Sequence, residues 1–154
     1  MMKSMKMERS FTLVLTFLLA GSFVSPARGN EDNLKPGTYV ANVTQTTTAI
    51  TDGTTVTDNL IMRIKIISID EESNVKAQII LSNNQQGDVS GTIDSEGKLR
   101  LEGFLTHKVL PGKREFKLTA VVKDNTLTNG KYIKTSSTLK STGEFKVAVL
   151  EEKD

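Results

Sequence analysis

The chain of 154 residues contains no cysteine, no tryptophan, one histidine and three prolines. Without cysteine it can form neither disulfide bonds nor thiolate metal ligands. A zinc site would need His107 together with carboxylates, which is uncommon, so we expect no metal and a surface histidine at a strand end. A secreted chain without disulfides is more typical of a bacterial envelope protein than of a small eukaryotic extracellular domain.

The first 29 residues have the layout of a secretory signal peptide. A positively charged start is followed by an apolar, uncharged run at residues 11–20 and by small residues up to Gly29. We expect cleavage near Gly29, with a cut before Arg28 as the alternative. The apolar run is too short to cross the ~30 Å hydrocarbon core of a membrane comfortably, and no cysteine follows it to accept a lipid. The sequence therefore predicts a secreted or periplasmic protein with a single domain, residues 30–154.

Charge is unevenly distributed along the predicted domain. Residues 30–97 carry four basic and ten acidic side chains, whereas residues 98–146 carry eleven basic and four acidic ones. Such asymmetry can steer an anionic partner toward one side of a molecule. Neighbouring strands that pair opposite charges across a sheet would also produce it, and this simpler interpretation is favoured.

Apolar and polar residues alternate with a period of two almost everywhere in the predicted domain, which is typical of half-buried β-strands. Threonine is abundant between residues 44 and 57, which favours strands, and we find no convincing amphipathic helix. Short turns make consecutive strands antiparallel, so we predict an all-β meander of about eight strands that closes, or nearly closes, into a barrel. The predicted strands are residues 37–47, 60–69, 75–81, 89–93, 99–106, 116–122, 132–136 and 145–150.

The opening Gly37-Thr38-Tyr39 and the eight short-turned strands resemble the calycins, the small barrels that include avidins and lipocalins. The resemblance is architectural and covers residues 30–154. Those families usually carry a tryptophan after the opening glycine, where this sequence has Tyr39. Avidins also wall their ligand with several tryptophans, so biotin binding is not implied. The resemblance implies a binding or inhibitory barrel rather than an enzyme.

No motif in the sequence predicts catalysis, and we expect a non-enzymatic protein without a cofactor. Acidic residues beside glycine, such as Asp94 and Glu96, are more typical of turns than of paired catalytic carboxylates. Residues 124–130 lack the alternating acids and terminal glutamate of a calcium loop. No glycine-rich loop joins a strand to a helix, so we expect no phosphate-binding loop.

Two further classes of protein are disfavoured. Basic residues lie near aromatic ones after residue 98, as in nucleic-acid-binding proteins, but the predicted signal peptide argues against an intracellular nucleic acid. The aromatic content is 5%, and the outward faces of the predicted strands are charged. A membrane-spanning barrel would instead need aromatic girdles and an apolar outer band.

Two functional hypotheses remain, and the favoured one places function at the surface of a filled barrel. The protein would then be an inhibitor or accessory that binds an extracellular or envelope protein, or another envelope component. The candidate partner-binding residues are Lys113, Arg114 and Lys117. The candidate binding surfaces are residues 46–58, 82–88 and 110–114.

In the alternative hypothesis, a small apolar ligand binds inside the barrel, as in a lipocalin or an avidin. The candidate ligand-binding residues are Tyr39, Met62, Leu101, Phe104, Phe116, Tyr132 and Phe145. The side chains expected to face the interior are Met62, Ile64, Ile66, Ile79, Leu99, Leu101, Phe116, Leu118, Phe145 and Val147. Gly91 and Gly103 are also expected to face it, where they would leave room or mark bends. The apolar residues are large enough to pack the barrel, which is why the surface hypothesis is favoured.

Overall fold

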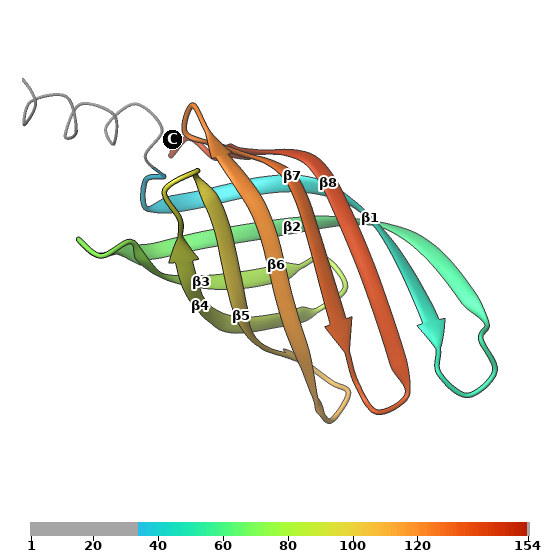
Figure 1. Ribbon diagram of the computed structural model, residues 1–154. Helices are drawn as coiled ribbons and strands as arrows, with labels where there is room; N and C mark the ends of the chain where they lie inside the picture. The colour runs from blue at the N-terminus through green and yellow to red at the C-terminus, as the bar shows by residue number, and fades with distance from the viewer. Residues whose placement is uncertain (1–33, 154) are drawn as a thin grey trace, which may run out of the picture. The chain divides into compact units, whose positions relative to one another are not determined.

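The computed structural model describes residues 34–153 of the chain. The predicted signal peptide, residues 1–29, and its cleavage point lie outside the described residues. Eight antiparallel strands follow one another in chain order and close into a barrel, because β1 pairs with both β2 and β8 (Figure 1). The strands are β1 Gly37–Ala49, β2 Thr55–Ile69, β3 Asn74–Leu81, β4 Gln85–Ile93, β5 Lys98–His107, β6 Lys113–Lys123, β7 Thr126–Thr135 and β8 Leu139–Leu150.

The predicted all-β meander barrel is thereby confirmed. Alternating side chains place one face of each strand toward the barrel axis and the other toward solvent, as the period of two requires. Within residues 34–153, no helix has the length and apolar content that crossing a membrane would require.

The β4–β5 turn is built around an aspartate, as predicted for an acidic residue beside glycine. Oδ1 of Asp94 accepts hydrogen bonds from the backbone N–H groups of Lys98 at 2.9 Å and Glu96 at 3.0 Å. These donors, Lys98 foremost, stabilise the ionised carboxylate and lower the pKa of Asp94. Gly97 completes the turn with a φ of 80°, a conformation that favours glycine.

The barrel axis is filled by apolar side chains. Tyr39, Met62, Leu101 and Phe116 have no surface accessible to water, so no water-sized space adjoins them. The expected inward orientation is confirmed for all the named side chains except Val147: the buried ones are Met62, Ile64, Ile66, Ile79, Leu99, Leu101, Phe116, Leu118 and Phe145.

The expectation that Val147 faces the interior is wrong. Between two of their paired positions, β8 holds one residue more than β1, which is a β-bulge. The inward face of β8 therefore passes from Phe145 directly to Ala148, and Val147 is 46% exposed. A β-bulge also occurs in β2 between Ile66 and Ser68, where a bend was expected. Ile67 stays outward, as the alternation requires, but Ser68 is exposed as well and Ile69 packs against the core.

Gly91 and Gly103 face the interior as expected. Gly103 lies between the buried Leu101 and Leu105 in the alternation of β5. A Cβ atom at Gly91 would collide with the carbonyl oxygen of Arg100, and one at Gly103 with the backbone and side chain of β4. The close approach of β4 and β5, rather than free space for a ligand, therefore accounts for these two glycines.

Glycines also face aromatic rings across β7 and β8. Gly143 is paired with Tyr132, and Gly130 is paired with Phe145. A Cβ atom at either glycine would collide with the ring opposite. The two rings therefore lie flat over the glycine backbone and fill the inner wall where the strands bend.

The strands reach further toward one end of the barrel than the alternation predicted. β4 begins at Gln85, so the loop expected at residues 82–88 is a turn of residues 82–84. Much of the surface expected at residues 46–58 is strand, because β1 ends at Ala49 and β2 begins at Thr55. Most of these additional strand residues are polar, and Gln85 among them is buried.

Candidate functional site

The two ends of the barrel differ in chemistry. At the end where β1 begins, Leu34 is buried and the hydroxyl of Tyr39 lies 2.9 Å from both the carbonyl oxygen of Lys35 and Oδ1 of Asn125. The backbone N–H of Lys35 donates to the same hydroxyl at 3.2 Å. Tyr39 thus links residues 34–36 to the β6–β7 turn at this end.

The opposite end carries buried polar side chains in place of apolar ones. In an antiparallel meander, odd-numbered strands end where even-numbered strands begin, so residues distant in sequence meet at one rim. Gln45 of β1, Gln85 of β4, Lys134 of β7 and Ser141 of β8 meet in this way, and each is 3–8% exposed. We call this region the polar mouth. Its larger lining set is Gln45, Thr47, Val56, Asp58, Asn83, Gln85, His107, Leu110, Arg114, Lys134, Ser136, Leu139 and Ser141.

A hydrogen-bond network joins the base of the polar mouth to the aromatic core. Oε1 of Gln45 accepts from the Tyr132 hydroxyl at 2.7 Å and from Nζ of Lys134 at 3.0 Å. Nε2 of Gln45 donates to Oγ1 of Thr47 at 3.3 Å, and this hydroxyl lies 2.9 Å from Oγ of Ser141. These bonds hold Gln45 and Lys134 in position, because breaking them would leave buried polar groups without partners, which is unfavourable for the free energy of folding.

Lys134 is a buried cation with which no acidic side chain of the described chain forms an ion pair. Burial foremost, and the nearby charge of Arg114 in addition, lower the pKa of Lys134 from 10.5 to about 8. Among residues 34–153, the one ion pair joins Lys117 and Glu115, at 3.4 Å on the outside of β6. Asp58 lines the mouth but forms no ion pair with either cation.

Three buried polar atoms of the mouth have no hydrogen-bond partner within the described part of the chain. They are the acceptors Oδ1 of Asn83 and Oε1 of Gln85, and the donor Nη1 of Arg114. All three residues line a cavity of about 330 Å³ that opens at the end of the barrel. The three atoms themselves have almost no accessible surface, so a polar molecule held in this cavity supplies the missing partners where these side chains turn toward it.

His107 lies at the end of β5, as expected, and lines the polar mouth. Its Nδ1 atom accepts hydrogen bonds from the backbone N–H groups of Val109 and Leu110, both at 3.1 Å. The histidine therefore shapes the β5–β6 loop that forms one side of the rim. Among residues 34–153, no three histidine or acidic side chains lie together in a way that would hold a metal ion.

The candidate ligand-binding residues are separated by the fold. Tyr39, Met62, Leu101, Phe116 and Phe145 belong to the packed axis. Tyr132 also belongs to the core, but its hydroxyl reaches the polar mouth.

Phe104 lies on the opposite face of its strand from these core residues. It is 57% exposed on the outside of β5. Its two chain neighbours, Gly103 and Leu105, point inward, so Phe104 between them points outward. It cannot line an interior ligand site.

The candidate partner-binding residues are also divided. Lys113 and Lys117 are exposed on the outer face of β6, whereas Arg114 points toward the polar mouth. The alternation of β6 separates them, since residues at odd and even positions leave opposite faces of a strand.

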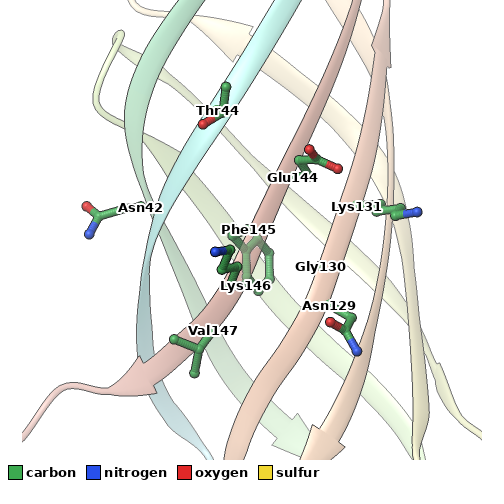
Figure 2. A pocket seen from close by; sticks show the side chains of 9 residues that line it. All are labelled: Asn42, Thr44, Asn129, Gly130, Lys131, Glu144, Phe145, Lys146 and Val147. Carbon is green, nitrogen blue, oxygen red and sulfur yellow. The ribbon is translucent and has the colours of Figure 1, made fainter.

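A second hollow lies on the outside of the barrel, where the bulged part of β8 passes between β7 and β1 (Figure 2). It measures about 640 Å³, and Figure 2 shows Lys131, Glu144, Lys146 and Val147 projecting around it. These side chains are exposed, so their polar groups are hydrated and a ligand would have to displace that water. The polar mouth is the stronger candidate because its polar groups are already buried.

Sequence analysis missed Gln45, Lys134 and Ser141, and it included Gln85 only as part of the candidate surface at residues 82–88. The pattern did contain a signal: Lys134 continues the inward alternation of Gly130 and Tyr132, and Gln45 continues that of Tyr39, Ala41 and Val43. A polar residue at the end of an apolar inward series marks the point where a barrel interior opens to solvent. The chain has no significant match among protein-family models, curated proteins or solved structures.

Proposed function

We propose that this protein is a secreted or periplasmic binding protein, not an enzyme, and that it holds a small ligand in the polar mouth. The observation that carries the proposal is the set of buried, unpartnered atoms on Asn83, Gln85 and Arg114 around one cavity. Each such atom destabilises the empty protein by roughly 1–3 kcal/mol, and a ligand that pairs with it recovers that free energy.

The position of the cavity distinguishes this proposal from an apolar carrier. The barrel axis is occupied by its own side chains, so the space for a ligand lies above them at the mouth. A volume of about 330 Å³ is at the lower end of the range for ligand pockets, which favours a small molecule. The closed eight-stranded meander supports a calycin-like relationship as part of the proposal.

Chemical-shift perturbation of the backbone amides tests the proposal. The purified ¹⁵N-labelled protein is titrated with a library of small polar molecules, both charged and neutral. We expect at least one member to shift the amides of Gln45, Gln85 and Lys134. Replacing Gln85→Leu should abolish that binding, whereas Gln86→Leu, at the exposed neighbouring position, should preserve it. Shifts confined to other surfaces, or equal loss in both variants, would contradict a site at the mouth.

We propose a protein partner as a second candidate function, on the basis of an open edge in β2. Residues 55–60 of β2 pair with β1 on one side. On the other side, pairing with β3 begins only at Met62, so within the described part of the chain these six residues have no strand neighbour. An exposed edge of this length accepts an extended segment of another protein as an added strand.

Hydrogen exchange tests this second candidate. A partner strand added to the edge should slow the exchange of amides within residues 55–60 when the protein is mixed with an envelope protein fraction. Amides of residues 62–66, which already lie between two strands, provide the internal control. Unchanged exchange at residues 55–60 with every fraction would oppose an added strand.

A further inference from the structure

The two cations of the polar mouth define the chemistry of its ligand. We infer that, if the mouth is the binding site proposed above, its ligand is a small organic anion that carries a hydroxyl group close to its charged group. The charged group binds between Lys134 and Arg114, and the hydroxyl donates to Asn83 or Gln85.

The anionic group follows from the surroundings of Lys134. Its side chain is 4% exposed, and within the described part of the chain its one hydrogen-bonded partner is the neutral amide oxygen of Gln45. An ammonium group has three donors, so two remain available. A buried charge without a counterion is strongly unfavourable, and a bound anion would supply the missing counterion.

Arg114 provides the second contact to the anion. Its Nη1 atom is buried and unpartnered, and the residue lies close enough to Lys134 to influence its charge state. A guanidinium group presents donors in a fixed plane that matches the oxygens of a carboxylate or a phosphate. Two cations that repel each other in the empty protein would therefore be brought together by one shared anion.

The hydroxyl group follows from the unpaired acceptors. Oδ1 of Asn83 and Oε1 of Gln85 are buried without a donor among residues 34–153. An anion that lacks a hydroxyl would satisfy the cations and leave both acceptors unpaired. A hydroxyl on the same molecule pairs with one of them, so the mouth should discriminate between anions that differ only in this group.

The size limit follows from the base of the mouth. Tyr132 and Phe116, with ring centroids 5.3 Å apart, fill the axis directly below Gln45. A long hydrocarbon chain could not extend past these rings into the barrel. The ligand is therefore a compact molecule that fits a space of about 330 Å³.

Isothermal titration calorimetry at pH 7 tests the inference with four probes. Glycolate and glycerol 3-phosphate carry both an anionic group and a hydroxyl, and they distinguish a carboxylate from a phosphate ligand. Acetate is the counterpart of glycolate without the hydroxyl, and ethylene glycol keeps the hydroxyls without the charge. We expect at least one hydroxylated anion to bind, glycolate to bind ten times more tightly than acetate, and ethylene glycol not to bind.

Matched variants locate the binding. Lys134→Met and Arg114→Gln should each weaken binding of the better hydroxylated anion at least tenfold. Lys117→Met, an exposed lysine on the outer face of β6, should change it less than twofold. Circular dichroism of each variant establishes that it is folded, and Arg114→Gln provides the test if Lys134→Met fails to fold.

The outcomes separate this inference from the proposed function. If neutral molecules shift the mouth amides while none of the anions binds, the binding site stands and the anionic ligand is wrong. If anions bind but Lys117→Met removes binding as strongly as Lys134→Met, general surface charge is responsible and the inference falls. If neither anions nor neutral molecules perturb the mouth, the proposed function itself falls.

Discussion

Lys134 combines burial with positive charge, and this combination affects the stability of the fold. Its ammonium group lies above Tyr132, bonds to Gln45 and is near Arg114, while His107 and Asp58 line the same cavity. The unfolded chain would hydrate this charge fully. Folding is therefore opposed by Lys134 at any pH at which the unfolded lysine is protonated.

Raising the pH from 8 to 10 should stabilise the protein. The pKa of Lys134 is about 8 in the folded state and 10.5 when unperturbed, so between these values the unfolded chain binds more protons. The free energy of unfolding should rise by about 2 kcal/mol over this interval. Burial raises the pKa of Tyr132, which opposes the effect above pH ~10 and limits the useful interval.

Urea denaturation at pH 7, 8, 9 and 10 measures this pH dependence. Lys134→Met provides the control, because it fills a similar volume without a titratable group and should show no rise with pH. A wild-type protein whose stability is flat or falling between pH 8 and 10 would mean that Lys134 is hydrated in solution.

The sequence predicted which residues form the core, and its candidate surfaces include several residues that line the mouth, but it did not predict the buried Gln45, Lys134 and Ser141. A period of two places Tyr132 inside and equally places Lys134 inside. A lysine is almost never fully buried without a partner, so its residue type argues against the inward position that the alternation gives it. That preference describes typical protein cores, and it does not hold at the end of the barrel, where the core meets a cavity.

At the scale of the strand, bulges decide which residues face the core. The β7 and β8 strands each contain a bulge at a similar position along the barrel axis. The register of β7 against β6 shifts between Thr119 and Val121, and the register of β8 against β1 shifts as well. Each extra residue turns the strand locally and lets a small barrel bend tightly. The bulge in β8 leaves Lys146 and Val147 both outside.

Two adjacent substitutions in β8 test this shifted alternation. Val147→Thr should change the free energy of unfolding by less than about 0.5 kcal/mol, because the side chain is 46% exposed. Ala148→Leu should destabilise by roughly 1–3 kcal/mol, because its site has no accessible surface and a larger side chain would overpack the core. Thermal or urea denaturation compares the two variants. A larger destabilisation by Val147→Thr than by Ala148→Leu would mean that the alternation is uninterrupted and that Val147 faces the interior.

Polar strand ends explain why the strand bounds were predicted less well than the strands themselves. Alternation is visible only where one face is apolar, and it disappears at Gln85 and before Phe145, where both faces are polar. Turns with their own chemistry, such as the one at Asp94, were predicted correctly because local hydrogen bonds determine them.

Over the whole molecule, the meander converts an asymmetry along the sequence into an asymmetry in space. Residues 34–97, in which acidic side chains outnumber basic ones, contain β1 to β4, and the basic segment 98–146 contains β5, β6 and β7, so the two charges occupy opposite sides of the barrel. Some opposite charges do face each other, as Glu102 faces Lys117 and Glu144 faces Lys131. These pairs lie within the basic side and do not remove its excess charge, which supplies Arg114 and Lys134 to the mouth.

A filled axis predicts a measurable difference between this barrel and an apolar carrier. Leu101→Ala should destabilise the protein by about 2–5 kcal/mol and leave an apolar cavity that takes up benzene. Ile133→Ala, at a 46% exposed position on β7, should cost far less and create no cavity. Benzene-induced changes in the methyl resonances of the core report uptake, and we expect them in Leu101→Ala but not in the wild-type protein. Uptake by the wild-type protein would show that the axis opens in solution, and it would move the binding site from the polar mouth to the barrel interior.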